Sequence, residues 1–245
     1  MEIFVLVFLF ISFIVYGSIE YYKHQSVLSS IPIRIHINGA RGKSSVTRLV
    51  AAGLRAGGLK TLAKTTGSAP RIIDQKGKDH VIHRLRSASI GEQINLIKLF
   101  SNEKPDAMVI ECMAVQPEYQ WVTEQRMVKS TIGVITNVRP DHLDEMGYDL
   151  ESIALSLANT IPFYSTFITA EQKNVVPLKK ISEKRKTKFL QSSPDEIDTD
   201  YMMKFPFLEH AENVALALKV CEQAGVEKEV ALDGMIHTKP DPGAL

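Results

Sequence analysis

A short glycine-bracketed turn near the start of the chain limits what the chain can fold into. The apolar run 33–38 ends at Gly39, two residues follow, and Gly42-Lys43-Ser44 then opens a stretch with helical periodicity. A strand, a tight glycine turn and a helix N-terminus in this order form a cradle for phosphate. Backbone N–H groups face the anion, the lysine neutralises phosphate oxygens and the serine hydroxyl can ligate magnesium. We call residues 39–45 the phosphate loop; the alternative is an ordinary glycine-rich turn before a helix.

Short β-branched runs alternate with helical stretches along the rest of the chain. The predicted strands are residues 33–38, 60–65, 106–112, 131–136 and 166–169, and the predicted helices are residues 43–56, 90–101, 150–160 and 211–224. This alternation predicts an α/β fold with a mostly parallel sheet and helices on both faces. In such sheets the ligand lies beyond the carboxyl ends of the strands, where the phosphate loop is expected.

The N-terminus differs from the rest of the chain. Residues 3–19 are almost uninterruptedly apolar and uncharged, and as a helix they would be about 25 Å long, close to the thickness of a hydrocarbon core. Positive charges follow the span and only Glu2 precedes it, which predicts an outside N-terminus and a cytoplasmic body. The alternative, a cleaved signal peptide, lacks a clear basic n-region and cleavage site. The predicted units are an anchor in residues 1–22, a polar linker in residues 23–32 and a nucleotide-binding domain in residues 33–245.

Net charge and cysteine content indicate which partners and which cellular compartment to expect. The net charge of +1 provides no general attraction for nucleic acid, so no nucleic-acid partner is expected. Cys112 and Cys221 both lie in apolar stretches and are expected to be buried thiols in a reducing compartment rather than a disulfide.

Polar side chains follow two of the predicted strands. Glu111 ends one apolar run, Asn137 follows another, and Asp141 and His142 come a few residues later. Because parallel strands end at the same edge of a sheet, these groups are expected near the phosphate loop, where they could hold magnesium or orient its ligands. Taken singly, a strand-end glutamate is more often a solvated charge and an aspartate more often a helix cap.

Residues 137–147 contain Asn137 and, after three residues, the run Asp141-His142-Leu143-Asp144. This pattern is similar to the signature Asn-x-x-x-Asp-His-(Leu/Met)-Asp, and through it the chain resembles the Mur ligases and folylpolyglutamate synthases, and more narrowly the ligase subunits of poly-γ-glutamate synthases. The phosphate loop has two residues where a standard Walker A loop has four, as in Mur-type amide ligases. Further matching segments are residues 64–67, 90–93, 111–115 and 240–244, so the resemblance covers the whole chain.

The resemblance implies ATP and Mg²⁺ as cofactors and assigns roles to residues. Lys43 would bind the β- and γ-phosphates, and Lys43, Glu111 and His142 would be the catalytic residues. The implied metal-site residues are Ser44, Thr66 or Ser68, Glu111 and His142. The implied nucleotide-binding residues are Asn38, Gly39, Arg41, Gly42, Lys43, Ser44, Ser45, Asn137 and Asn213. Asn213 would contact the adenine end of ATP, and its alternative is a solvent-facing helix asparagine.

The implied reaction is ATP-dependent addition of glutamate to a growing poly-γ-glutamate chain through an acyl phosphate. The implied partners are glutamate, the polymer, the cell membrane and other subunits of a polymer synthesis and export complex; a homo-oligomer is left open. The basic segment 71–86, a loop or hairpin, is a candidate guide for the polyanionic product, with an ordinary solvated loop as the alternative. Its candidate substrate residues are Arg71, Lys76, Lys78, Arg84 and Arg86.

Two departures from the family pattern affect these expectations. The lysine that many Mur ligases carbamylate is Leu157 here, which argues against carbamylation and not against catalysis. The sequence ends at Leu245, where the C-terminal domain that closes over ATP is expected to begin. The alternative function is therefore a non-catalytic nucleotide-binding scaffold or regulatory subunit of a membrane complex. A third possible function is that of an NTPase unrelated to ligation, but the short phosphate loop and the Asp-His-Leu-Asp run disfavour it.

Overall fold

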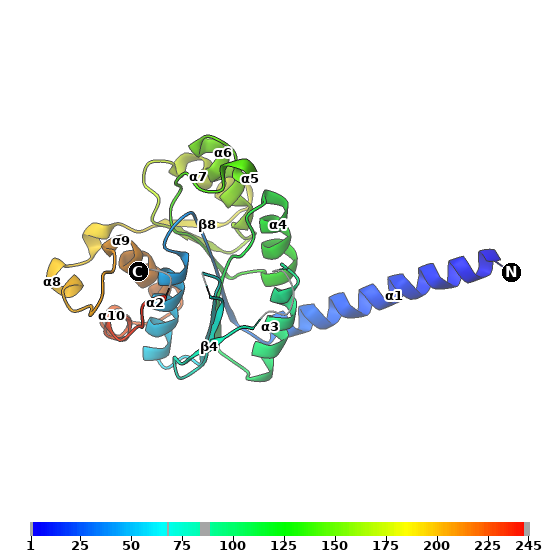
Figure 1. The fold of residues 1–245 in the computed structure, drawn as a ribbon, viewed down its shortest axis with the longest axis horizontal. Helices are drawn as coiled ribbons and strands as arrows, with labels where there is room; N and C mark the ends of the chain where they lie inside the picture. The colour runs from blue at the N-terminus through cyan, green and yellow to red at the C-terminus, as the bar shows by residue number, and fades with distance from the viewer. Residues whose placement is uncertain (1, 68, 84–88, 243–245) are drawn as a thin grey trace.

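One eight-stranded sheet organises the body of the computed structural model, which describes residues 2–67, 69–83 and 89–242 (Figure 1). The strands are β1 Ile33–Asn38, β2 Thr61–Thr65, β3 Arg71–Ile73, β4 Asp79–Val81, β5 Ala107–Glu111, β6 Ile132–Ile135, β7 Thr166–Thr169 and β8 Lys188–Gln191. Their order across the sheet is β4-β3-β2-β5-β1-β6-β7-β8. All pairings from β2 to β8 are parallel, and β3 and β4 add an antiparallel hairpin at one edge. The mostly parallel sheet is thus confirmed.

Helices cover both faces of the sheet, as predicted. They are α1 Glu2–Ser29, α2 Lys43–Ala56, α3 Glu92–Asn102, α4 Pro117–Val122, the π-helix η1 Thr123–Val128, α5 Leu143–Met146, α6 Leu150–Leu157, the 3-10 turns η2 Ala158–Thr160 and η3 Pro194–Glu196, α7 Val175–Lys184, α8 Thr199–Met202, α9 Ala211–Gln223 and α10 Lys228–Ile236. Helices α2, α9 and α10 lie on one face, and α3 and α4 lie on the other (Figure 1). Leu157 is fully buried in the apolar cluster over β6 and β7, which fits the predicted absence of a carbamylated lysine.

Strand β1 shows why the two faces differ. Its isoleucines pack into the core beneath α2, whereas His36 and Asn38 point to the opposite face, toward α4 and η1. His36 Nδ1 lies 2.7 Å from Glu124 Oε2, and Asn38 Nδ2 donates to Gln120 Oε1 at 2.8 Å. Burial by itself lowers the pKa of His36, but its contacts with Cys112 and Glu124 outweigh burial and raise the pKa to about 10. This buried polar pairing holds the base of the phosphate loop on the α4 side.

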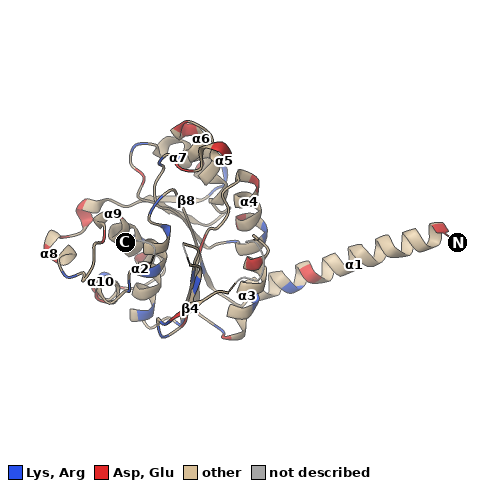
Figure 2. Cartoon of the chain, in the orientation of Figure 1, with Lys and Arg blue, Asp and Glu red and all other residues tan. Residues whose placement is uncertain are grey.

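Helix α1 projects from the body as a single helix (Figure 1). Its 28 residues are about 42 Å long, and it is long and apolar enough to cross a membrane. Figure 2 shows charged residues only at its N-terminus and in the part nearer the body. Residues 23–29 continue the helix, so most of the predicted linker is helical. Arg34 Nη1 donates to the carbonyl oxygens of Leu28 and Ile31 at 3.2 and 2.8 Å, which caps the helix end and joins it firmly to β1. The division into anchor and nucleotide-binding domain stays a prediction.

Candidate functional site

The phosphate loop joins β1 to α2 at the carboxyl edge of the sheet. Gly39 has φ +132° and Gly42 has φ +82°, conformations that other residues rarely adopt. A Cβ atom on Gly42 would also lie 2.7 Å from Asn213 Oδ1, so the second glycine is needed for close approach as well as for backbone shape. The sharp turn directs the first N–H groups of α2 toward the open edge of the sheet. Lys43 Nζ donates to two carbonyl oxygens of the phosphate loop at 2.7 and 3.2 Å.

Glu111 connects the phosphate loop with the loop that follows β2. It ends β5 and is almost fully buried. Its Oε2 accepts a hydrogen bond from Ser44 Oγ at 2.8 Å and another from the Thr66 N–H at 2.7 Å. The structure therefore brings together three residues predicted for the metal site, and it does so through one carboxylate oxygen.

The loop after β6 fixes the backbone of the phosphate loop. The Arg41 N–H donates to Asn137 Oδ1 at 3.1 Å, while Asn137 Nδ2 and Thr136 Oγ1 donate to the Arg41 carbonyl oxygen at 3.2 and 2.6 Å. The side chain of Asn137 is thus committed to positioning the phosphate loop. The Arg41 guanidinium lies 3.5 Å from Asp141, and the ring of His142 lies 4.0 Å from the same carboxylate.

The three residues predicted to be catalytic line one cavity. Lys43, Glu111 and His142 border a space of about 350 Å³ above the carboxyl ends of β1 and β5. Half of the His142 side chain is exposed, and the residue adopts φ +44°, which presents it at the start of α5. The cavity is a suitable size for the phosphates of a nucleotide together with a reacting carboxylate.

A second hollow borders the first turn of α2, and it includes a residue to which the sequence analysis assigned no role. Asp241 lines it together with Ser44 and Ser45. A Cβ atom on Gly67 would lie 2.9 Å from Asp241 Oδ2 and 3.3 Å from Ser44 Oγ, so the Asp241 carboxylate sits directly beside the phosphate loop. The only signal for it in the sequence was its place in the matching segment 240–244.

The donor set fits magnesium held jointly with a nucleotide. In the part of the chain that the structure describes, no group of three or more His, Cys, Asp and Glu side chains could hold a metal ion. The oxygens of Glu111 and Ser44 are hard ligands, and magnesium characteristically combines one or two such groups with water and substrate phosphates. Ser68, the alternative to Thr66, lies outside the described residues.

Two predicted nucleotide-binding asparagines have protein partners. Asn38 donates to Gln120, so its amide is used beneath the phosphate loop although the residue borders the cavity. Asn213 is buried and donates to Glu209 Oε1 at 2.8 Å, so the solvent-facing alternative is wrong. Its Oδ1 lies beside Gly42, so the side chain is next to the phosphate loop.

The described part of the basic segment is a hairpin of β3 and β4. Arg71 Nε lies 3.9 Å from Asp79, within the hairpin itself. Lys76 and Lys78 are exposed at the turn and border a different cavity from that of Lys43. The remaining candidates, Arg84 and Arg86, lie outside the described residues.

Comparison with known proteins identifies relatives of this chain. Residues 37–236 match the Mur ligase middle domain. The chain is 38% identical over 236 residues to the capsule biosynthesis protein CapB of Bacillus anthracis, covering 95% of this chain and 50% of that protein. It is 36% identical over 234 residues to the PGA synthase CapB of Bacillus subtilis strain 168, covering 95% and 60%. The chain thus spans about half to three fifths of the length of these relatives.

A solved structure shares the fold. The bifunctional folylpolyglutamate synthase/dihydrofolate synthase with Mn, AMPPNP and L-glutamate bound superposes with a TM-score of 0.67 at 18% identity. The superposition covers 91% of this chain and 62% of that one. The overall fold is therefore common to both.

Proposed function

Because the chain belongs to the Mur ligase family, we propose that it is the ATP-binding part of an amide ligase that adds glutamate to a growing poly-γ-glutamate chain. The names of the relatives support the substrate, since one is called a capsule biosynthesis protein and the other a PGA synthase. The observation that carries the proposal is the phosphate loop itself, with Lys43 over it and the Ser44–Glu111–Thr66 contacts at its side.

The proposed reaction has two steps. A carboxylate oxygen at the chain end attacks the γ-phosphorus of ATP, and the bond between this phosphorus and the oxygen that it shares with the β-phosphate breaks. ADP departs, and the phosphoryl group is then joined to the chain end as an acyl phosphate. The amine of glutamate then attacks the acyl carbon, the bond to the phosphate oxygen breaks, and the amine loses a proton as phosphate departs. Since phosphoryl transfer needs little covalent work from a protein, the task of the chain is to position the reactants and to stabilise charge.

The proposed contributions of the residues follow from their places at the cavity. Lys43 would exchange its two carbonyl contacts for the β- and γ-phosphate oxygens, and the first N–H groups of α2 would face the same anion. Glu111 and Ser44 would hold magnesium, which would supply positive charge to stabilise the phosphates when bound. His142 would orient groups at the open side of the cavity. Thr136 and Asn137 act indirectly, since they hold the phosphate loop in shape.

The proposed location is the cell membrane, with α1 as a single span and the body in the cytoplasm. The length and apolar surface of α1 support this placement, as does the need of the body for ATP. A membrane-bound ligase could pass its polymer to an export partner in the same membrane, so the proposed partners are the membrane and other subunits of a synthesis and export complex.

Release of ADP tests the proposal. Membranes containing the chain, tested alone and together with the part of a CapB relative that the chain does not match, should release ADP from MgATP much faster when glutamate and a poly-γ-glutamate primer are present. The Lys43→Ala variant in the same membranes is the control for other ATPases.

ATP binding without glutamate-dependent ADP release would contradict the ligase proposal. That result would instead favour the alternative of a nucleotide-binding scaffold or regulatory subunit.

A further inference from the structure

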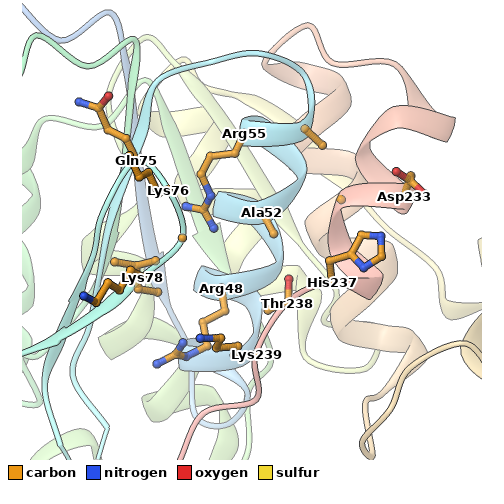
Figure 3. Close-up of a pocket in the computed structure, with 14 residues that line it drawn as sticks. Arg48, Ala52, Arg55, Gln75, Lys76, Lys78, Asp233, His237, Thr238 and Lys239 are labelled. Atoms are coloured by element: carbon orange, nitrogen blue, oxygen red, sulfur yellow. The ribbon is translucent and has the colours of Figure 1, made fainter.

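A cavity of about 530 Å³ lies away from the phosphate loop, between α2, the β3–β4 hairpin and the end of α10 (Figure 3). We call it the α2 cavity. It follows α2 from Arg48 to Ala56, whereas the phosphate loop lies at the N-terminus of that helix. A single helix therefore borders two separate spaces.

Basic side chains from three elements of the fold meet at the border of the α2 cavity. Six of its lining residues are basic: Arg48 and Arg55 from α2, Lys76 and Lys78 from the hairpin turn, and His237 and Lys239 after α10. Asp233 is the acidic residue at its border, and Figure 3 shows it on the far side of α10, turned away from the arginines. An excess of positive charge around a concave space favours an anionic occupant.

Arg55 has hydrogen-bonding capacity that the fold does not use. Its Nη1 is buried without a hydrogen-bond partner among the described residues. The guanidinium lies against the turn of the hairpin, where a Cβ atom on Gly77 would be 3.6 Å from its Nε and Nη2. Burial lowers the pKa of Arg55, and the nearby Asp74 and Asp79 carboxylates offset this effect only in part. Thr238 Oγ1, at the same cavity, is likewise buried and unpartnered.

The nearby carboxylates are already committed to other groups. Asp74 Oδ1 accepts from the N–H groups of Lys76 and Lys78, both at 2.9 Å, and its Oδ2 lies 2.8 Å from His80 Nε2. The hairpin turn thus uses the Asp74 carboxylate for its own shape, and the lysine ammonium groups remain at the surface.

The Asp79 carboxylate also has a partner within the protein. It binds Arg48 with both oxygens, at 3.1 and 2.8 Å. Arg48 is therefore neutralised, whereas Arg55 forms no ion pair among the described residues and feels the Asp74 and Asp79 carboxylates only as neighbours. The two arginines are seven residues apart on α2, which places them on one face about 10 Å apart along the helix. Because Arg48 is paired with Asp79, the positive charge open to a ligand comes from Arg55 together with the exposed Lys76 and Lys78, which can contact several anionic groups of one ligand.

We propose that the α2 cavity is a carboxylate-binding site that holds the poly-γ-glutamate chain at a distance from the phosphate loop. This proposal rests on the proposed function for the identity of the polymer. Each γ-linked residue keeps a free α-carboxylate that titrates near 4, so the polymer carries about one negative charge per residue at neutral pH. Arg55 would take one carboxylate, and the exposed lysines would attract its neighbours along the chain.

Binding of γ-linked glutamate oligomers to the full chain in detergent micelles tests the site. Arg55→Met keeps the length of the side chain and removes its charge, and it should weaken oligomer binding about ten- to hundredfold, as expected for the loss of a hydrogen bond between charged groups. Binding of a non-hydrolysable ATP analogue should stay within twofold of wild type.

Two controls separate this role from others. Lys98→Met, on the exposed surface of α3 across the sheet, removes the same charge and should leave oligomer binding within twofold of wild type. The melting temperature of Arg55→Met should be unchanged or higher, because an incompletely stabilised charge has been removed from a partly buried position. A lower melting temperature together with normal oligomer binding would identify Arg55 as a structural residue.

Three other results of these binding experiments would also decide whether the α2 cavity binds the polymer. Oligomer binding equal in Arg55→Met and wild type overturns the proposal, whatever happens to the ATP analogue. Arg55-dependent binding of inorganic phosphate without oligomer binding would replace carboxylate by phosphate as the ligand. Failure of ATP binding with Arg55-dependent oligomer binding intact would count against the ligase proposal and leave this site standing.

Discussion

Replacing Gly42 by alanine tests whether the shape of the phosphate loop depends on close approach to α9. The substitution requires a left-handed conformation, which costs a non-glycine residue about 1–2 kcal/mol. The new Cβ atom would also lie 2.7 Å from Asn213 Oδ1. Moving Asn213 away would break its hydrogen bond with Glu209, at a further cost of about 1.5–3 kcal/mol for a bond to a charged group.

Gly58 offers a matched control. It has φ +84°, nearly the same as the +82° of Gly42, but a Cβ atom there would meet nothing within 4 Å. Gly58→Ala therefore incurs the backbone cost alone. For a chain of this size, 1 kcal/mol corresponds to about 2–4 °C in melting temperature, so Gly42→Ala should melt about 3–12 °C below Gly58→Ala.

Thermal unfolding of the two variants and titration with an ATP analogue would measure both effects. Gly42→Ala should bind the analogue at least about tenfold more weakly, since the loop that cradles phosphate has moved, and Gly58→Ala should bind it normally. Equal melting temperatures, or normal nucleotide binding by Gly42→Ala, would refute the reasoning that this glycine allows the phosphate loop to pack against Asn213.

Three further predictions address the metal site, the buried histidine and the membrane. Glu111→Gln should raise the magnesium concentration needed for half-maximal binding of the ATP analogue; an unchanged midpoint would exclude a magnesium role. The pKa of His36 is about 10 in the folded protein and near 6.5 in the unfolded chain, so its contribution to stability should be complete below pH 6.5 and should decline toward pH 10. In denaturation experiments the His36→Gln variant should show a smaller loss of stability over this pH range. Since both native cysteines are buried, Glu2→Cys should react with an impermeant thiol reagent on intact cells and Ser30→Cys should not; the reverse pattern would invert the proposed topology.

Local signals in the sequence account for the elements that were predicted. Helix α2 was predicted with the bounds that the structure has, because a glycine turn marks its start and an apolar stripe its length. The segment 71–86 was predicted only as a loop or hairpin, and β8, α7 and α10 were not predicted; β8 is a short strand, and α10 carries little amphipathic periodicity. Helix α10 packs on α2 and α9, and β8 pairs with β7, and no short window of sequence reveals such contacts between distant segments.

Contacts between distant segments account for what the sequence could not predict at the site. The position of Glu111 at a strand end was readable, but its double hydrogen bond with Ser44 and Thr66 depends on the order of β1, β2 and β5 in the sheet. The pairing of His36 with Glu124 joins residues 88 positions apart. For the same reason the basic segment appeared as an isolated patch, whereas the fold places it opposite the arginines of α2.

Titration of the full chain with a non-hydrolysable ATP analogue and magnesium tests the central claim, that residues 39–45 form a nucleotide-binding loop. Wild type should bind the analogue in a magnesium-dependent manner. Lys43→Ala should bind it at least about tenfold more weakly, because a charge-assisted contact with phosphate is lost, while its melting temperature without nucleotide stays close to that of wild type. Equal affinity of Lys43→Ala and wild type, or the absence of binding by wild type, would contradict the account.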